Sequence, residues 1–339
     1  MIDIADKNSL ESYLLERGVI RKEEGYSLHY CKGGVSGTVA FVYAGEKPLI
    51  VKQALGQLKV KEDWFCDPNR MGIEYRSNEI YHRLAPDCAP EVYFYDEENY
   101  IYGREAVPEN CSMWKEDLLS GLLDFSVAEK TINTLSLVHN GCAGDREIAE
   151  VFADKKIFYD LRISPYIEFT AGKYPEIADF ARPIVKELME NAITLVHGDF
   201  SPKNIMVMGR NVSILDYEVA HYGHPSFDLA FFSNHFVLKA VKNKYWAGAY
   251  IAMLEYMLGI YFPKVRFMPA PELEQSFVRL LSLLMLARVD GKSPAEYITL
   301  DEDKELIRTM AFKIIRGNLS AYRQILPLFV KQISQKENS

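Results

Sequence analysis

Cysteine is scarce in this sequence, and long apolar runs are missing. The 339 residues include 5 cysteines, an odd number with neither a C-x-x-C pair nor the Cys/His spacing of a zinc site. This excludes a disulfide-stapled scaffold and favours a reduced interior. The longest apolar run, near Leu280–Ala287, is far below the roughly 20 residues of a membrane-spanning helix, and the first residues carry acids where a signal peptide carries bases. We therefore expect a cytoplasmic protein without a membrane segment.

An excess of positive charge is also missing. The 39 basic and 47 acidic side chains leave a net charge of −8, whereas nucleic-acid binding needs a concentrated basic face. A nucleic-acid partner is therefore not expected, although a few local cations and Mg²⁺ can still accommodate ATP. The sequence has no internal repeat, its 48% of hydrophobic residues is typical of a folded protein, and its length corresponds to about two domains. The oligomeric state stays open.

Two styles of sequence follow one another. Residues 26–107 contain short runs rich in Val, Tyr and Phe and broken by Gly and Pro, which predict antiparallel strands. These runs are YSLHYC, TVAFVY, PLIVKQA, EVYFYD and YIYGREA. Apolar residues at helical spacing predict one main helix over 70–84, and a short helix is expected over 9–17, with Gly18 beyond its end. The first part is therefore expected to be a sheet with one main helix.

The second style is helical and begins after Pro108. Apolar periodicity predicts helices over 118–139, 177–191, 227–258, 272–288 and 304–319. One exception is a small hairpin, in which IMVM and VSIL are separated by Gly209-Arg210-Asn211. The expected fold class is α+β, with an N-terminal domain over 1–107 and a larger, mainly helical domain over 108–339.

The most informative segment begins at His197-Gly198-Asp199. Asn204 follows Asp199 by 5 positions, which is the H-x-D-x-x-x-x-N spacing of a kinase catalytic loop. In that chemistry an Asp orients the attacking hydroxyl and accepts its proton, and an amide oxygen helps to hold Mg²⁺. The hairpin then returns the chain, so that Asp216 can face the same phosphates. The pattern predicts Asp199 as the catalytic residue, and Asn204 and Asp216 as metal ligands.

The run HGDFSPKNIMV, followed by ILDYE and FDLAFF, resembles the aminoglycoside phosphotransferase and choline kinase superfamily, small-molecule relatives of the protein kinases. The resemblance covers most of the chain and implies a two-lobed protein-kinase-like fold that uses ATP and Mg²⁺. It adds Glu218 to the metal site or its surroundings, because choline and methylthioribose kinases have a D-x-E at this place. Asp228, at the start of an apolar helix, is expected to tie down the catalytic loop.

Phosphate-binding groups are predicted in the first half. A turn between two predicted strands contains Gly33, Gly34 and Gly37. Without side chains, its backbone N–H groups could approach a phosphate closely, although a plain glycine hairpin would look the same. Lys52, on an otherwise apolar strand, resembles the strand-3 lysine that contacts the α- and β-phosphates of ATP. Its ion-pair partner is predicted to be Glu74, with Glu79 on the same helix as the alternative.

The segment from Glu105 to Val107 ends the predicted sheet. In a protein-kinase-like fold this segment is the hinge, whose backbone C=O and N–H groups bind the adenine edge. Glu105 and Val107 are therefore the predicted adenine contacts, although a plain linker would look much the same.

The stretch around Lys52 carries a closer resemblance, to bacterial and plant 5-methylthioribose kinases. It is carried by VKQAL, Asp63-Trp64, Arg70 and Ile73-Glu74. In that family a Trp-containing insertion lies near the nucleotide, and Trp64 could equally anchor an irregular loop. Two positions depart from the family: Asn204 replaces a Ser, and only Arg288 represents the two adjacent arginines that grip the sugar. Arg288 is predicted either to contact the substrate or to make a structural ion pair.

These residues together predict an ATP-dependent kinase that phosphorylates a hydroxyl of a small, sugar-like molecule. An aminoglycoside, choline or amino-alcohol acceptor is the alternative within the same chemistry. Choline would need an aromatic cage, and the nearest supply is Tyr245, Trp246, Tyr250 and Tyr256, which core packing explains better. A nucleotide-binding protein without catalysis is the other alternative. We favour the kinase because Lys52, Asp199, Asn204 and Asp216 are all present.

Overall fold

The computed structural model describes residues 2–31, 37–45, 48–54 and 67–337. The chain forms two compact units: unit 1 comprises Met1–Cys111 and Ser213–Val219, and unit 2 comprises Ser112–Val212 and Ala220–Ser339. The predicted border at residue 107 divides the chain into two continuous parts. Unit 1 of the structure also contains the segment Ser213–Val219, which lies far beyond that border in the sequence. This short segment includes Asp216 and Glu218.

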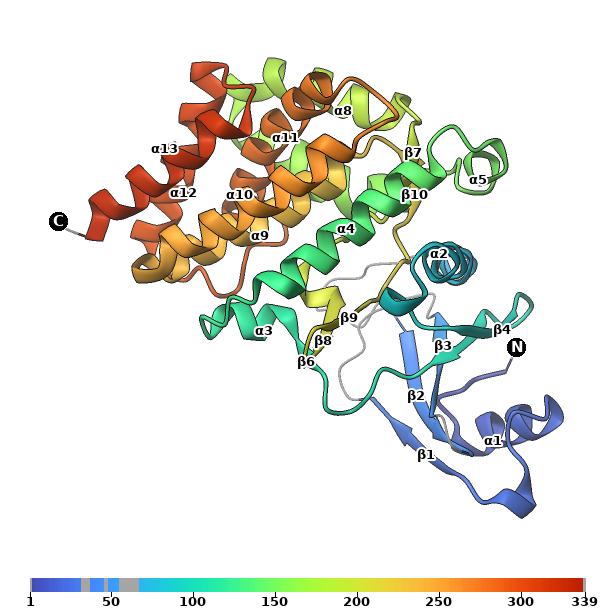
Figure 1. Ribbon diagram of the computed structural model, residues 1–339. Helices are drawn as coiled ribbons and strands as arrows, with labels where there is room; N and C mark the ends of the chain where they lie inside the picture. The colour runs from blue at the N-terminus through green and yellow to red at the C-terminus, as the bar shows by residue number, and fades with distance from the viewer. Residues whose placement is uncertain (1, 32–36, 46–47, 55–66, 338–339) are drawn as a thin grey trace. The chain divides into compact units, whose positions relative to one another are not determined.

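Unit 1 is built on a five-stranded antiparallel sheet (Figure 1). Its strands are β1 (Ser27–Tyr30), β2 (Gly37–Tyr43), β3 (Leu49–Ala54), β4 (Val92–Asp96) and β5 (Ile101–Glu105). They are ordered β1-β2-β3-β5-β4. All five coincide with the predicted Val-, Tyr- and Phe-rich runs, whose residues fit a pleated, half-buried surface. The predicted antiparallel sheet is confirmed.

Two helices cover this sheet, α1 (Lys7–Glu16) and α2 (Arg70–Leu84). The apolar residues of α1 share a buried cluster with Val51 of β3, whereas Met71 of α2 packs against Ala54 of the same strand. Because successive side chains of a strand point to opposite faces, Lys52 shares its face with Ala54. The pattern of β3 therefore directs Lys52 toward the side that α2 covers.

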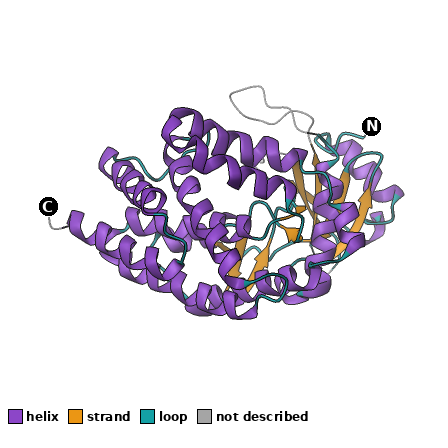
Figure 2. Cartoon of the chain, turned by 90° about the horizontal axis from the view of Figure 1, so that it is seen from above, coloured by secondary structure: helices purple, strands orange, loops and turns teal. Residues whose placement is uncertain are grey.

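Unit 2 is mainly helical, and the C-terminal part of the chain in Figure 2 is drawn almost entirely as helix. Its helices are α3 (Trp114–Leu119), α4 (Phe125–Cys142), α5 (Arg146–Val151), α6 (Lys156–Phe158), a π-helical segment (Tyr159–Glu168), α7 (Phe169–Lys173), α8 (Ala178–Glu190), α9 (Ser226–Lys242), α10 (Ala247–Tyr261), α11 (Ala270–Asp290), α12 (Asp301–Gly317) and α13 (Tyr322–Glu337). Helix α9 is buried from Ser226 to Val241 and packs against α10 and α11. It is therefore the central helix of this unit.

Short strands also lie outside the five-stranded sheet, and the fourth of them reaches Ile214 in unit 1. They are β6 (Ser112–Met113), β7 (Thr194–Val196), β8 (Ile205–Met208), β9 (Asn211–Ile214) and β10 (His221–Gly223). Strand β7 pairs with β10, and a small sheet has the order β6-β8-β9. The predicted hairpin is confirmed as β8 and β9, with Gly209 at a φ of 60° in the turn, where glycine is favoured. The loop between β7 and β8 carries Asp199.

Two predicted helices are each divided in the structure. The predicted helix 118–139 is interrupted between α3 and α4, where Gly121 has a φ of 88° and the Asp124 carboxylate caps α4 by accepting from Ser126 N–H at 2.8 Å. The predicted helix 227–258 is interrupted between α9 and α10. There Asn243 follows the last residue of α9, and its side-chain amide donates to Tyr250 Oη at 2.8 Å. Apolar periodicity continues across both breaks, so periodicity alone did not reveal them.

The fold class is confirmed: an antiparallel sheet with one main helix precedes a mainly helical unit. Within the described ranges, no helix is both long and apolar enough to cross a bilayer.

Candidate active site

The backbone of the catalytic loop is fixed by one buried carboxylate. Asp228, in the first turn of α9, accepts the N–H of His197 at 2.7 Å and the N–H of Gly198 at 2.9 Å. His139 Nε2 lies 3.2 Å from the same carboxylate, and Tyr261 Oη lies 2.6 Å from His139 Nδ1. Since all of these groups are buried, each polar atom needs such a partner. The structural role expected for Asp228 is confirmed.

Asp199 lies at the centre of the loop and is buried. Its Oδ1 lies 2.9 Å from Arg162 Nη2, and its Oδ2 lies 3.0 Å from Lys203 Nζ. The amide of Asn204 donates to Oδ2 at 2.8 Å and to the Asp199 carbonyl at 3.0 Å. Arg162 Nε also donates to the carbonyl of Gly198 at 2.7 Å. The carboxylate is therefore held from both sides, with a fixed orientation.

These neighbours decide the charge of Asp199. Burial alone would raise its pKa, but the charges of Arg162 and Lys203 and the hydrogen bonds from Lys203 and Asn204 bring the pKa well below its ordinary value. Asp199 is therefore an anion and a weak base, suited to orienting a hydroxyl. The sequence prediction missed both cations. Lys203 stands inside the motif itself, whereas nothing in the segment around Arg162 indicated its contact with Asp199.

A lysine and a glutamate form the main ion pair of unit 1. Lys52 Nζ lies 2.6 Å from Glu74 Oε2, and both side chains are largely buried. Glu79 is exposed and instead accepts from Tyr75 Oη at 2.8 Å. The geometry thus joins Lys52 to Glu74 rather than to Glu79.

The acidic segment Asp216-Tyr217-Glu218 adds two carboxylates to this group. Asp216 Oδ1 lies 3.3 Å from Lys52 Nζ, and Glu218 Oε2 lies 3.2 Å from Arg70 Nε. Between them Tyr217 is buried, with its ring centroid 4.7 Å from that of Tyr81. The tyrosine anchors the segment in the core of unit 1, and Arg70 and Glu74 are one helical turn apart on α2.

The carboxylate oxygens of Glu74, Asp216 and Glu218 lie within 4.8 Å of one another. Burial lowers the pKa of Lys52, but the charges of the three carboxylates raise it by more than burial lowers it. The pKa therefore lies above its ordinary value, and Lys52 is a cation. Burial and then the charge of Asp216 raise the pKa of Glu218 to about 7. Three hard oxygen donors in mutual repulsion fit a divalent cation such as Mg²⁺. Asn204, the other predicted ligand, belongs to unit 2.

The predicted nucleotide contacts are only partly described. Gly33, Gly34 and Trp64 lie outside the described residues. Gly37 opens β2, where a Cβ atom would come within 2.6 Å of the carbonyl oxygen of Gln53, so close strand packing already requires this glycine. Glu105 ends β5, and its N–H donates to the Glu91 carbonyl at 2.8 Å. Its own carbonyl accepts from Arg104. Val107 follows the strand and lies outside any helix or strand.

Arg288 lies in the last turn of α11 and is buried. Its guanidinium donates to Ser293, at 3.0 Å for the hydroxyl, and lies 5.9 Å from the ring centroid of Tyr166. No acidic partner is found for it in the described ranges. The four aromatics considered for a choline cage are dispersed: Tyr250 is buried, whereas Tyr245, Trp246 and Tyr256 are exposed. Packing in the core therefore explains the aromatic residue at Tyr250, but not the three exposed ones.

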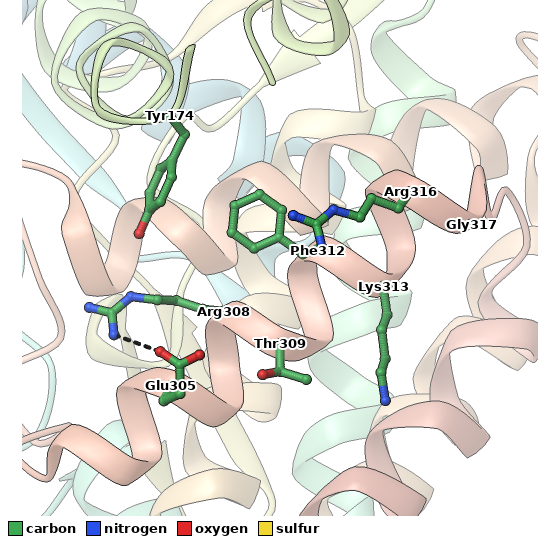
Figure 3. Close-up of a pocket in the computed structure, with 8 residues that line it drawn as sticks. All are labelled: Tyr174, Glu305, Arg308, Thr309, Phe312, Lys313, Arg316 and Gly317. Atoms are coloured by element: carbon green, nitrogen blue, oxygen red, sulfur yellow. Dashed lines mark hydrogen bonds and ion pairs between the residues drawn. The ribbon is translucent and has the colours of Figure 1, made fainter. Parts of the chain in front are cut away.

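A separate hollow of about 660 Å³ runs along α12 in unit 2 (Figure 3). It is lined by Tyr174, Glu305, Arg308, Thr309, Phe312, Lys313, Arg316 and Gly317. Its cations are engaged by the protein: Arg308 Nη2 pairs with Asp290 at 2.7 Å, Lys313 Nζ donates to Gln332 at 2.7 Å, and the Arg316 guanidinium lies 4.9 Å from the Phe312 ring centroid. The hollow contains none of the predicted site residues.

Comparison with known proteins relates these features to one family. The model of the phosphotransferase enzyme family matches residues 158–267, which include the catalytic loop and the D-x-E segment. Methylthioribose kinase 1 of Oryza sativa subsp. japonica is 25% identical over 266 residues, which are 69% of this chain and 62% of that protein. The methylthioribose kinase of Bacillus anthracis is 24% identical over 258 residues, 68% of this chain and 65% of the relative. The matches thus span less than two thirds of these relatives.

Two solved structures share the fold. The choline kinase of Cryptosporidium parvum superposes with a TM-score of 0.57 at 12% identity, covering 95% of this chain and 98% of that one. An amicoumacin kinase solved with AMP-PNP and Ca²⁺ superposes with a TM-score of 0.53 at 11% identity, covering 93% and 97%. The resemblance read from the sequence is therefore confirmed: this chain is similar to phosphotransferases over residues 158–267 and to methylthioribose kinases over about two thirds of its length, and it shares the fold of a choline kinase.

Proposed function

We propose that this protein is an ATP-dependent kinase that transfers the γ-phosphate to a hydroxyl of a small, sugar-like molecule. The observation that carries the proposal is the group of Lys52, Glu74 and Asp216, in which one lysine pairs with a helix glutamate and with the acid that follows the catalytic loop. Kinases need these three groups together for phosphoryl transfer. The same chain also carries Asp199 in a kinase-type catalytic loop, and the two features together favour a catalytic kinase over a nucleotide-binding protein without catalysis.

Each residue has a defined task in this proposal. Lys52, oriented by Glu74, neutralises the phosphates of ATP. Asp199, fixed by Arg162 and by the loop that Asp228 holds, orients the acceptor hydroxyl and takes its proton. Phosphoryl transfer depends mainly on positioning and charge neutralisation, so these few groups suffice. Glu105 and Val107 are the proposed backbone contacts to adenine, and Gly33, Gly34 and Gly37 the proposed phosphate turn.

Mg²⁺ is the proposed metal cofactor. Asp216 and Glu218 would hold it, with Glu74 beside them and Asn204 as a ligand from the catalytic loop. The ion would supply charge neutralisation on the β- and γ-phosphates. Burial, and then the charge of Asp216, raise the pKa of Glu218 to about 7, and the closeness of the three carboxylates supports a site for a cation there.

The acceptor is proposed to be sugar-like because the matched relatives are methylthioribose kinases. Methylthioribose itself stays doubtful, since one arginine stands where that family has two. An aminoglycoside, choline or an amino alcohol is the alternative, although the dispersed aromatics give no support to choline. We propose a cytoplasmic protein whose partner is this small molecule, without a nucleic-acid or membrane partner.

Coupled measurement of ADP release tests the proposal. The purified protein is given ATP and Mg²⁺ with each member of a panel of pentoses, hexoses, sugar acids, sugar phosphates, methylthioribose, aminoglycosides, choline and amino alcohols. We expect slow ATP hydrolysis without acceptor and acceleration by one class of acceptor. An absence of both ATP binding and hydrolysis would contradict the kinase, whereas ATP binding without any turnover would favour the non-catalytic alternative.

A further inference from the structure

A second buried lysine, in unit 2, has surroundings that the proposed chemistry leaves unexplained. Lys239 lies on the central helix α9, and its residue is fully buried. Within the described ranges its Nζ has no hydrogen-bond partner. A buried ammonium without a partner is costly, and fully buried lysines are almost always paired. Lys239 is therefore short of a ligand rather than satisfied by the fold.

The groups nearest Lys239 do not supply an anion to pair with it. Its Nζ lies 5.2 Å from the ring centroid of Tyr297, whose hydroxyl also has no partner among the described residues. Burial, and then the charge of Lys115, lower the pKa of Lys239 to about 7. Glu296 and Glu116 raise it, but Lys115 already pairs with Glu296. The charges around the Lys239 amine therefore favour the binding of a negatively charged group.

Arg288 adds a second incompletely used cation to the same place. Its charge lowers the pKa values of both Lys239 and Tyr297, so the three side chains are neighbours. The Nη1 of Arg288 binds Ser293, whereas its Nε is buried without a partner in the part of the chain that the structure describes. Tyr297 and Ser293 are only partly buried. The cluster therefore lies directly beneath the surface of unit 2.

A shared aromatic ring connects this cluster to the candidate catalytic residue. The guanidinium carbons of Arg288 and Arg162 each lie 5.9 Å from the ring centroid of Tyr166, and Arg162 pairs with Asp199 at 2.9 Å. His235, one helical turn before Lys239, is influenced by the charges of Lys239, Arg288 and Asp199. Tyr166 is therefore a neighbour both of the cationic cluster and of the arginine that holds Asp199.

The hollow along α12 in Figure 3 provides an internal contrast. It is also rich in cations, yet Arg308 pairs with Asp290 and Lys313 donates to Gln332. The cations of this hollow thus already have partners within the protein. Only at Lys239 and Arg288 do buried donors remain unused among these groups.

We propose that Lys239 and Arg288 bind an anionic group, a carboxylate or a phosphate, on the molecule that Asp199 engages. This inference rests on the proposed kinase function and narrows its acceptor to hydroxylated molecules that carry a negative charge. A charged hydrogen bond to such a group satisfies the amine and the guanidinium together. The neutral sugars and the cationic aminoglycosides or choline lack the group that these two residues require.

Thermal-shift titrations with a matched set of probes test the inference without any need for turnover. Glucose, gluconate and glucose 6-phosphate share a frame and differ in charge, and AMP-PNP with Mg²⁺ keeps the nucleotide site filled. We expect one or both anions to bind the wild-type protein about ten-fold more tightly than glucose, since each charged hydrogen bond is worth roughly a factor of ten. The two anions distinguish a carboxylate site from a phosphate site.

Lys239→Met keeps the length of the side chain and removes its charge, and Lys313→Met is the matched control in the satisfied hollow. The anion preference should fall about ten-fold in Lys239→Met and stay within about two-fold in Lys313→Met. Arg288→Gln provides a second variant. A preference that survives Lys239→Met, or a wild-type protein that binds neither anion more tightly than glucose, overturns the inference. Phosphorylation of a neutral acceptor in that case would leave the kinase proposal standing.

Discussion

The two units arrange the charges of their candidate sites in opposite ways. In unit 1, the carboxylates of Glu74, Asp216 and Glu218 lie together, and Lys52 and Arg70 pair with them. In unit 2, two cations, the buried Arg162 and the exposed Lys203, pair with the carboxylate of Asp199. Acids thus predominate in the first group and bases in the second. Because opposite charges attract, the first group is suited to a metal ion and the second to an anion.

The largest expected effect comes from removing the acid of unit 2. Asp199→Asn keeps the volume of the side chain and should lower turnover by roughly 10³-fold, because positioned acid–base groups contribute about 10²–10⁴-fold. ATP affinity, measured by calorimetry, should change by less than about two-fold, since the phosphate-binding groups belong to unit 1. Asp160→Asn, at a half-buried residue of the same unit whose carboxylate pairs with Lys156, is the control. Wild-type turnover by Asp199→Asn would remove the catalytic assignment.

The next effect comes from removing the cation of unit 1. Lys52→Met leaves the carboxylates of Glu74, Asp216 and Glu218 with one cation fewer, and breaking the largely buried pair of Lys52 with Glu74 costs about 3–5 kcal/mol. Urea denaturation should show this loss, and Mg²⁺ should restore more stability to Lys52→Met than to the wild type. Lys7→Met, on the exposed face of α1, should be neutral. Equal sensitivity of both variants to urea would show that the carboxylates are balanced in another way.

A smaller effect is expected from the scaffold beneath Asp199. Asp228→Asn replaces one of the two oxygens that accept the N–H groups of His197 and Gly198 with a donor. A buried group left without a partner costs about 1–3 kcal/mol. Thermal denaturation should reveal this cost together with reduced turnover, and the exposed Asp179→Asn should reveal neither. Full turnover despite lost stability would show that the loop keeps its shape without Asp228.

The smallest effect, when it is measured over a single pH unit, is the pH dependence of stability at Lys239. Its pKa is about 7 in the folded protein and about 10.4 in an unfolded chain, so between these values the unfolded chain binds more protons. The stability of the wild type relative to Lys239→Met should therefore rise with pH from about 7 to 10, by at most about 1.4 kcal/mol per pH unit, and stay constant below. Denaturation at a series of pH values measures this slope. Saturating gluconate should flatten it, because a bound anion favours the charged lysine.

The sequence predicted those features that depend on local patterns. The strands of unit 1, the helix over 70–84 and the hairpin after the catalytic loop each follow from residue type and spacing, and the motif from His197 to Asn204 is contiguous. The fold class and the superfamily resemblance followed from them. Helix breaks at Gly121 and Asn243 were missed because the apolar period continues across both.

The partners of the site residues could not be predicted, because they come from distant parts of the chain. Arg162 reaches Asp199 from a π-helical segment with no recognisable motif. The choice between Glu74 and Glu79 depends on which face of α2 meets β3, and spacing alone did not determine this. Lys239 looks like an ordinary surface lysine in the sequence, and only the burial of α9 on all sides distinguishes it.

The assignment of Ser213–Val219 to unit 1 has a consequence for how this protein can be made and inherited. The chain leaves unit 1 at Cys111, returns at Ser213 and leaves again after Val219. A ribosome therefore releases a complete unit 1 only after residue 219 has emerged, when much of unit 2 has already been synthesised. Any fragment that ends at residue 111 lacks the acids Asp216 and Glu218. The two units therefore cannot be exchanged between proteins by a single crossover.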